Sequence, residues 1–560
     1  AVDIKMNSPA APYLGVNTAG SRAVRNFANF IIRNTMTGIR KSPEERTHNE
    51  TEALHLVFTG IQEANAKKAE KEPGAALSGV KSVNKRGLRG LAAHACICRK
   101  IISAKKRLAY PTLDKWFLGY EELDAIMKHA HSPAYYSCNS HVAQKAIRKT
   151  VEAWKSYFKA LKSWRKDPSK FKAKPHIPGY IRKKEATACF TNQACRLAEA
   201  AGKLYLVFMG LDRFLCIGKA SLIPGKYVHT EVKPYHGFYR LYITYEDSLE
   251  APKVPEDPKR MLGLDVGVGN FLTGLSNIGK EPVIIKGGWL KALNQWYNKR
   301  RAALVSGMSK GKKPGKEQKN SHNLDALSRD RDNRMRDFFY KAAHWVMRWC
   351  KENQIEVVVI GHNQGQKQGI DIGSRNNQNF VCIPFSRFIS ILKIVACRYG
   401  IPVVDREESY TSKASLLDMD KIPTYGKKGA GTAVFSGERI QRGLYRASDG
   451  RTLNADVNGA GNILRKEYPH AFDGLDLTYA CGKAIAVTGE AILKIKVRKQ
   501  PLEHYRKTCG AGSRIRHRMH REKYTLYHTL WEVKSKSSKK KGRQDNAGLK
   551  VNPEKGIGAA

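Results

Sequence analysis

The sequence lacks the paired cysteines that mark a structural zinc site. Its 11 cysteines are scattered and form no CxxC unit, whereas zinc ribbons normally contain two such pairs. The nearest cluster, His94, Cys96 and Cys98, lies in a basic segment, where ordinary core or surface thiols are the simpler interpretation. We therefore expect no zinc, and the scattered, odd number of cysteines indicates reduced thiols in an intracellular protein.

Acidic residues and long apolar runs are also scarce. The chain has 99 Lys and Arg against 50 Asp and Glu, a formal net charge of +49. Such an excess favours a polyanionic partner, and nucleic acid is the leading one. No stretch of about 18 apolar residues is present, so we expect no membrane span. We expect a monomer in the bacterial cytoplasm, associated with the nucleoid, or in the nucleus if the source is eukaryotic.

Shifts in composition divide the 560 residues into five predicted parts. Helical periodicity gives way to short alternating runs after Pro175 and Pro178, and the Pro-rich segment APKVPEDPKR acts as a linker. The parts are an N-terminal strand (1–25), a helical domain (26–175), a small antiparallel β-domain (176–257), a mixed α/β domain (258–480) and a basic, partly disordered C-terminal extension (481–560).

The segment AWKSYFKALKSW shows the helical pattern best. Trp154, Tyr157 and Phe158 recur at helical spacing and predict a helix-packing core rather than a platform for stacked bases. Lysines such as Lys155 and Lys159 fill much of the remaining surface, where a solvated face would normally mix signs of charge. We expect this helical region to lie along a phosphate backbone.

The α/β domain begins with three apolar runs at 261–266, 271–276 and 282–286. Helical segments follow from residue 288, then a strand at 356–360, a helix in SRFISILKIVACRYG and a strand in IPVVD. Three strands followed by helix, strand, helix and strand predict a mixed α/β sheet.

Carboxylates gather at three places in this domain. Asp265 ends an apolar strand, Asp456 precedes an apolar helix, and Asp405, Glu407 and Glu408 follow another strand. Taken singly, they have simple structural interpretations: a turn cap, a helix N-cap and a solvated acidic loop. Together in a strongly basic chain they indicate divalent cations, because carboxylates repel nucleic-acid phosphate unless a cation lies between them. Hard oxygen ligands favour Mg²⁺, with Mn²⁺ as a substitute, and two such ions promote phosphodiester hydrolysis.

The runs GLDVGVGNF, IPFSRFISILKIVACRYGI, EESYTSKAS, SGERIQRGLYR and NADVNGAGNIL resemble the RuvC-like domain of TnpB. TnpB is the transposon-encoded, RNA-guided nuclease ancestral to type V CRISPR effectors and related to Fanzor. The resemblance spans 258 to about 468 and implies an RNase H-like (RuvC) nuclease domain, preceded by a helical recognition domain and a β-barrel wedge domain. It also implies an RNA-guided, Mg²⁺-dependent DNA endonuclease whose partners are a structured guide RNA, a DNA duplex and its displaced single strand.

Asp265 and Asp456 match the two catalytic, metal-binding aspartates of that family, but the usual glutamate after the fourth strand is replaced by Gly361. Either the protein is an RNA-guided, DNA-binding repressor without nuclease activity, or the acid has moved. We favour a relocated acid just after the neighbouring strand and choose Glu408, which lies nearest to YTSK, while Glu407 stays open. This choice predicts that the Glu408 carboxylate points over Gly361 toward Asp265.

The interval between YTSK and the last aspartate, which carries a zinc ribbon in typical TnpB proteins, contains no cysteine here. Its glycines and lysines predict a mobile loop over 415–452 that becomes ordered on nucleic acid.

Overall fold

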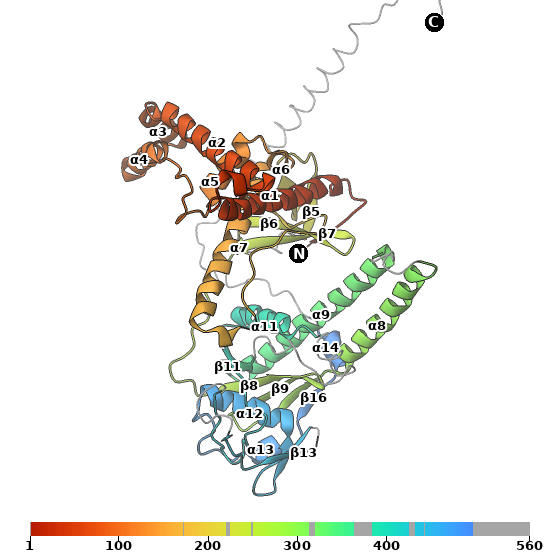
Figure 1. The fold of residues 1–560 in the computed structure, drawn as a ribbon. Coiled ribbons are helices and arrows are strands. Elements are labelled where there is room, and N and C mark those ends of the chain that lie inside the picture. The colour runs from red at the N-terminus through yellow and green to blue at the C-terminus, as the bar shows by residue number, and fades with distance from the viewer. Residues whose placement is uncertain are drawn as a thin grey trace, which may run out of the picture. The chain divides into compact units, whose positions relative to one another are not determined.

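The computed structural model describes residues 2–171, 173–219, 225–247, 250–312, 320–362, 383–424, 432–441 and 443–496 (Figure 1). The predicted C-terminal extension lies outside the described residues from residue 497 onward. None of the helices in the described ranges is long and apolar enough to cross a membrane.

Helices make up most of the first 171 residues. The helices are α1 (Ala11–Gly38), η1 (Pro43–Glu45), α2 (His48–Lys71), α3 (Ala75–Arg86), α4 (Gly90–Lys105), α5 (Tyr120–His129), α6 (Pro133–Tyr136), α7 (Ser140–Lys166) and η2 (Pro168–Lys170). Helix α1 begins well before residue 26, where the sequence pattern first indicated a helix. Its early turns bury Asn17, Thr18 and Ser21 together with Ala11 and Leu14, so polar residues interrupt the apolar stripe that periodicity would detect.

Helix α7 has the packing that its aromatic spacing predicted. Trp154 is fully buried, its indole N–H donates to Asn29 Oδ1 at 2.9 Å, and Tyr157 and Phe158 pack against the same core. Lys155 and Lys159 are exposed. The aromatic side is therefore core, and the basic side faces solvent.

Seven strands of the N-terminal part form two antiparallel sheets. The strands are β1 (Val2–Lys5), β2 (Ala188–Thr191), β3 (Cys195–Ala200), β4 (Lys203–Phe208), β5 (Phe214–Lys219), β6 (Lys226–Tyr235) and β7 (Phe238–Glu246). Their orders are β1-β7-β6-β2 and β3-β4-β5. The predicted wedge barrel is not closed in the part of the chain that the structure describes, because each sheet keeps two edge strands without a ladder to the other sheet.

The C-terminal part is built on one mixed sheet. Its strands run in the order β12-β11-β8-β9-β10-β16, and β9 is the one antiparallel member. The elements are β8 (Met261–Val266), β9 (Asn270–Ser276), β10 (Val283–Lys286), α8 (Gly288–Ser309), α9 (His322–Glu352), β11 (Val357–Gly361), α11 (Phe385–Tyr399), β12 (Val403–Arg406), β13 (Glu438–Gln441), β14 (Leu444–Arg446), β15 (Thr452–Asn454), α12 (Ala455–Glu467), α13 (Thr478–Cys481), β16 (Ile485–Val487) and α14 (Gly489–Lys494). The five strands predicted from residues 261 to 405 are all present.

Helices cover both faces of this sheet (Figure 1). Leu264 and Ile360 pack with α9 and α11 on one face. Residues of the opposite parity, such as Val359, pack with α12 on the other, as strand alternation requires. Gly263 lets α12 approach closely, since a Cβ there would lie 2.2 Å from the Ala460 carbonyl oxygen. The sheet therefore fixes α12 over the carboxyl ends of β8 and β11.

Candidate nuclease site

The site begins at adjacent ends of parallel strands. β8 and β11 pair in register with Leu264 opposite Ile360, and β11 and β12 pair with Gly361 opposite Arg406. The next residue of β8 is Asp265, and its parity directs its side chain to the face covered by α12. Gly459 of α12 leaves room for it, because a Cβ at 459 would lie 2.9 Å from Asp265 Oδ2.

Asp456 lies in the first turn of α12 without capping it. The N-cap is Asn454, whose Oδ1 accepts from the backbone N–H groups of Asp456 and Val457 at 2.9 and 3.4 Å. The Asp456 carboxylate instead accepts a 2.8 Å hydrogen bond from the Asn270 amide on β9. The N-cap interpretation of Asp456 therefore fails, and its side chain faces the sheet.

The three acids that follow β12 take different directions. Asp405 faces α11 and forms a 2.7 Å ion pair with Lys393 there. Glu407 forms a 2.5 Å ion pair with Lys466 at the end of α12 and accepts from the Ser409 backbone N–H at 2.7 Å. Burial raises the pKa of Glu407, but the bonds from Lys466 and Ser409 outweigh it and leave that pKa below its ordinary value. Glu407 is therefore tied to α12.

Glu408 occupies the space over Gly361. A Cβ built at 361 would lie 2.9 Å from Glu408 Oε2 and 2.5 Å from Ile463 Cδ1, closer than real side chains allow. The predicted position of this carboxylate, over Gly361 and near Asp265, is thus the one observed. The ion pair of Glu407 with Lys466 favours Glu408 as the site acid, which strand parity could not.

Three carboxylates that are far apart in sequence thus share one environment. Burial, then the charges of Glu408 and Asp456, raise the pKa of Asp265 to about 8, with Arg439 acting in the opposite direction. All three residues are only partly buried. Close like charges that remain accessible to solvent are a functional-site signature.

The donor set suits divalent cations. Asp265, Glu408 and Asp456 offer hard oxygen ligands of the kind that Mg²⁺ prefers. After burial, the charges of Glu408 and Asp456 raise the pKa of Asp265 further, and a bound cation would relieve this repulsion. Their ligand atoms do not all lie within 4.8 Å of one another. Among the described residues, that spacing occurs only in Cys189, His229 and Glu231.

That second cluster lies on β2 and β6 and has a different balance of charge. Glu231 already forms a 2.6 Å ion pair with Lys149 and a 3.3 Å contact with Lys233. Burial, offset in part by Glu231, leaves the pKa of His229 below its ordinary value. A cation at this cluster would have to displace the lysines, so the acidic cluster is the better cation site.

The interval 415–452, predicted as a mobile loop, contains regular structure in its described residues. Strands β13, β14 and β15 form a small antiparallel sheet. Asp420 accepts from the backbone N–H groups of Ser415 and Ser436 at 2.7 and 3.0 Å, and Asp418 accepts from that of Ser448 at 3.0 Å. Carboxylate hydrogen bonds thus cross-link this segment, which the sequence pattern did not reveal.

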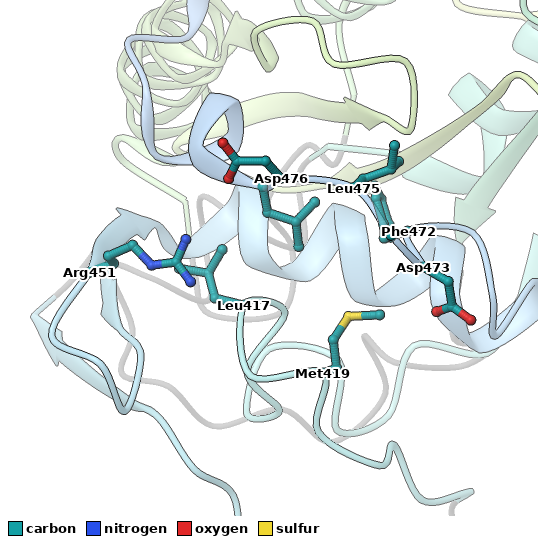
Figure 2. Close-up of a pocket in the computed structure, with 9 residues that line it drawn as sticks. Leu417, Met419, Arg451, Phe472, Asp473, Leu475 and Asp476 are labelled. Carbon is teal, nitrogen blue, oxygen red and sulfur yellow. The ribbon is translucent and has the colours of Figure 1, made fainter.

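A pocket of about 370 Å³ opens beside this segment (Figure 2). Met419, Phe472 and Leu475 supply apolar walls, and Arg451 and Asp476 supply charge. None of the three clustered carboxylates lines it. The chemistry that the acids support therefore lies outside this pocket.

Two protein-family models match adjoining parts of the chain. Residues 242–367 match a model described as a probable transposase, OrfB_IS605, and residues 385–463 match the Cas12f1-like TNB domain. The first match contains Asp265 and Gly361, and the second contains Glu408 and Asp456. Over these two matched ranges the chain is TnpB-like and Cas12f-like. The resemblance seen in the sequence motifs is confirmed over this region of the TnpB-like chain.

Solved structures similar to this TnpB-like chain include a Cas12f1–sgRNA–target DNA complex and a CRISPR-Cas12f ternary complex. The first is 13% identical, with a TM-score of 0.39, over 73% of this chain and 82% of that one. The second is 14% identical, with a TM-score of 0.28, over 76% and 82%. No curated protein matches the chain.

Sequence reasoning missed three residues around the acids of this TnpB-like protein: Asn270, Arg439 and Lys466. Lys466 had a detectable signal, because Asn458, Asn462 and Lys466 recur every four residues and so form a polar line along one face of the helix. Arg439 had none, since it lies in a separate small sheet. Its proximity to Asp265 depends on the tertiary fold.

Proposed function

We propose that this protein is an RNA-guided, divalent-metal-dependent DNA endonuclease with an RNase H-like (RuvC) nuclease domain. The observation that carries the proposal is the clustering of Asp265 with Glu408 and Asp456, with the Glu408 carboxylate over Gly361, in a region that matches both family models. The strand order with a single antiparallel member, β9, supports the RNase H-like assignment. The N-terminal helices and sheets would serve as recognition and wedge domains.

Asp265, Glu408 and Asp456 would hold two Mg²⁺ ions, or Mn²⁺ in their place. When bound, such ions activate water and stabilise the attacking and leaving oxygens of a phosphodiester. Asn270 orients Asp456 through its 2.8 Å hydrogen bond, and Lys286 in turn donates to Asn270 at 3.2 Å. Arg439 lies near enough to influence Asp265 and would counter phosphate charge at the same edge of the sheet.

The partners would be a structured guide RNA and its DNA target. Pairing by the RNA reads the target sequence while protein side chains read a short flanking motif, a division of labour known for RNA-guided effectors. The net charge of +49 and the exposed lysines of α7 suit backbone contacts to both nucleic acids. The displaced single strand would reach the acids along basic surface.

One experiment tests the proposal. The protein is purified with its RNA, the RNA is sequenced, and the complex is incubated with Mg²⁺ and a plasmid library that carries a randomised flank. We expect cleavage with a flank preference, and loss of at least about 10³-fold in rate for Asp265→Ala and Asp456→Ala with RNA retention unchanged, since metal and charge stabilisation supply most of the catalysis.

The other outcomes are distinct. Flank-dependent binding without cleavage would indicate a guided repressor, and neither binding nor cleavage would indicate a general RNA-binding protein. If the Asp265→Ala variant cleaves at the wild-type rate, the site assignment is wrong even if the wild type is a nuclease.

A further inference from the structure

One face of α12 holds the whole segment that presents Glu408. Asn458, Asn462 and Lys466 are spaced four residues apart and therefore form one line on the helix. The Asn458 amide donates to the Ala414 carbonyl at 2.8 Å, and its Oδ1 accepts from the Leu416 N–H at 2.8 Å.

Asn462, the next residue of this line on α12, holds the segment that follows Glu408. The Asn462 amide donates to the carbonyls of Thr411 and Ala414 at 3.0 and 2.7 Å. Both asparagines are fully buried, so these bonds are shielded from competing water. The segment from 411 to 416 is thus fixed to the helix whose first turn carries Asp456.

Lys466 completes the line immediately beside Glu408. Its side chain is only 4% exposed, and its ammonium contacts Glu407 Oε2 at 2.5 Å and donates to the Ser409 carbonyl at 2.8 Å. The residues on both sides of Glu408 are therefore fastened to one buried cation. The Glu408 carbonyl also accepts from the Thr411 hydroxyl at 2.8 Å.

We propose that Lys466 is a positioning residue for the relocated acid: by holding Glu407 and Ser409, it aims the intervening Glu408 carboxylate over Gly361 into the cation site. The proposal rests on the proposed function for the identity of that site. An acid at the end of β11 would be placed by the sheet itself, whereas an acid in a loop needs separate anchors. Lys466 supplies the anchor that holds both neighbours of Glu408.

The sign of the effect on metal affinity separates this role from simple electrostatics. Removing a positive charge near a cation site should tighten cation binding by Coulomb's law. Loss of an anchor should weaken it, because misplaced ligands and their supporting groups cost roughly 10- to 100-fold in metal affinity.

The test measures Mn²⁺ binding to the full-length protein, freed of nucleic acid, from the electron paramagnetic resonance signal of free Mn²⁺. The part of the Mn²⁺ binding that is lost in the Asp265→Asn variant is assigned to the proposed cation site. We expect Lys466→Met to weaken that binding roughly 10- to 100-fold. Lys466→Gln loses the same charge but keeps a hydrogen-bond donor, so we expect it to remain within about threefold of wild type. Lys393→Met, which breaks the partly exposed ion pair with Asp405, is the matched control and should bind as wild type does.

Equal or tighter Mn²⁺ binding by Lys466→Met would overturn the proposal, and so would equal losses in Lys466→Met and Lys466→Gln. If Lys466→Met does not fold, Glu407→Met removes the same ion pair from its more exposed side, and unchanged affinity there overturns the proposal. The proposal is also overturned if the wild-type protein shows no Mn²⁺ binding that Asp265→Asn removes. Intact binding without guided cleavage instead counts against the proposed function alone, because this readout uses no nucleic acid.

Discussion

Gly361 ends β11 beside Asp265 of β8 and opposite Arg406 of β12. Its missing side chain leaves the volume that Glu408 Oε2 and Ile463 Cδ1 enter. Any side chain at 361 would compete for that volume, so an acid on β11 and an acid at 408 are alternatives. The position of the Glu408 carboxylate therefore depends on glycine at 361.

The first prediction concerns this pair. In Gly361→Ala, the new Cβ would lie 2.9 Å from Glu408 Oε2 and should push the carboxylate off its position. Because a displacement of about 1 Å costs on the order of 100-fold, we expect single-turnover cleavage by the guide-loaded protein to fall by about that factor. Gly269→Ala, at a nearby turn where a Cβ meets nothing within 4 Å, is the control. Wild-type cleavage by Gly361→Ala would mean that Glu408 is not the third acid.

The sequence revealed the acids more readily than their supports. Asp265 and Asp456 lie in recognisable motifs, and the absence of an acid at 361 pointed to the acids after β12. Periodicity could not separate Glu407 from Glu408, because both lie in a loop where alternation no longer holds. Their difference comes from Lys466, a residue almost 60 positions later whose proximity depends on the packing of α12.

At the scale of elements, most strands of the six-stranded mixed sheet were predictable because they are short apolar runs bounded by turn residues. Helix α1 was missed at its start because its buried face contains Asn17, Thr18 and Ser21, which satisfy their polar groups locally or across the interface. The prediction of a wedge β-barrel was wrong for a different reason. Alternating apolar residues predict individual strands, but a barrel closes only if the edge strands pair with each other, and the pattern within one strand does not encode that pairing.

A second prediction concerns the start of α2. Hydrogen bonds from Thr37 and then Lys41 and Thr47 lower the pKa of Glu50 to about 2, and its side chain is 6% exposed. Since this folded-state pKa is below the unfolded value of about 4.5, Glu50 stabilises the fold fully above pH 4.5, and this contribution is lost as the pH falls toward 2. We expect Glu50→Gln to lower the free energy of unfolding by about 2 kcal/mol at pH 7.

Thermal unfolding at pH 7, 4 and 3 checks this prediction. The difference in Tm between wild type and Glu50→Gln should shrink steadily below pH 4.5. Glu52→Gln, at an exposed position of the same helix, should show a small difference throughout. A difference for Glu50→Gln that does not change with pH would rule out the charged carboxylate as its source.

At the scale of the whole molecule, Lys and Arg outnumber Asp and Glu by 99 to 50, which leaves a net charge of +49. Lysines such as Lys155 and Lys159 face solvent along α7, while the clustered carboxylates gather at a single sheet edge. The exposed lysines of α7 thus suit phosphate backbones, whereas the clustered carboxylates suit metal ions. Binding and chemistry should therefore respond differently to salt.

The last prediction follows from that difference. We expect the protein freed of RNA to bind a random-sequence DNA duplex with an affinity that falls roughly 10³-fold or more between 50 and 200 mM NaCl, the loss typical of six or more phosphate contacts. Fluorescence anisotropy of a labelled duplex measures it. Asp265→Asn should show the same slope as wild type, because the proposed function assigns its carboxylate to cation binding rather than to backbone contacts. Prior loading with a structured RNA should flatten the slope, since RNA phosphates then occupy the basic surface, and a slope unchanged by RNA would show that guide and duplex use separate surfaces.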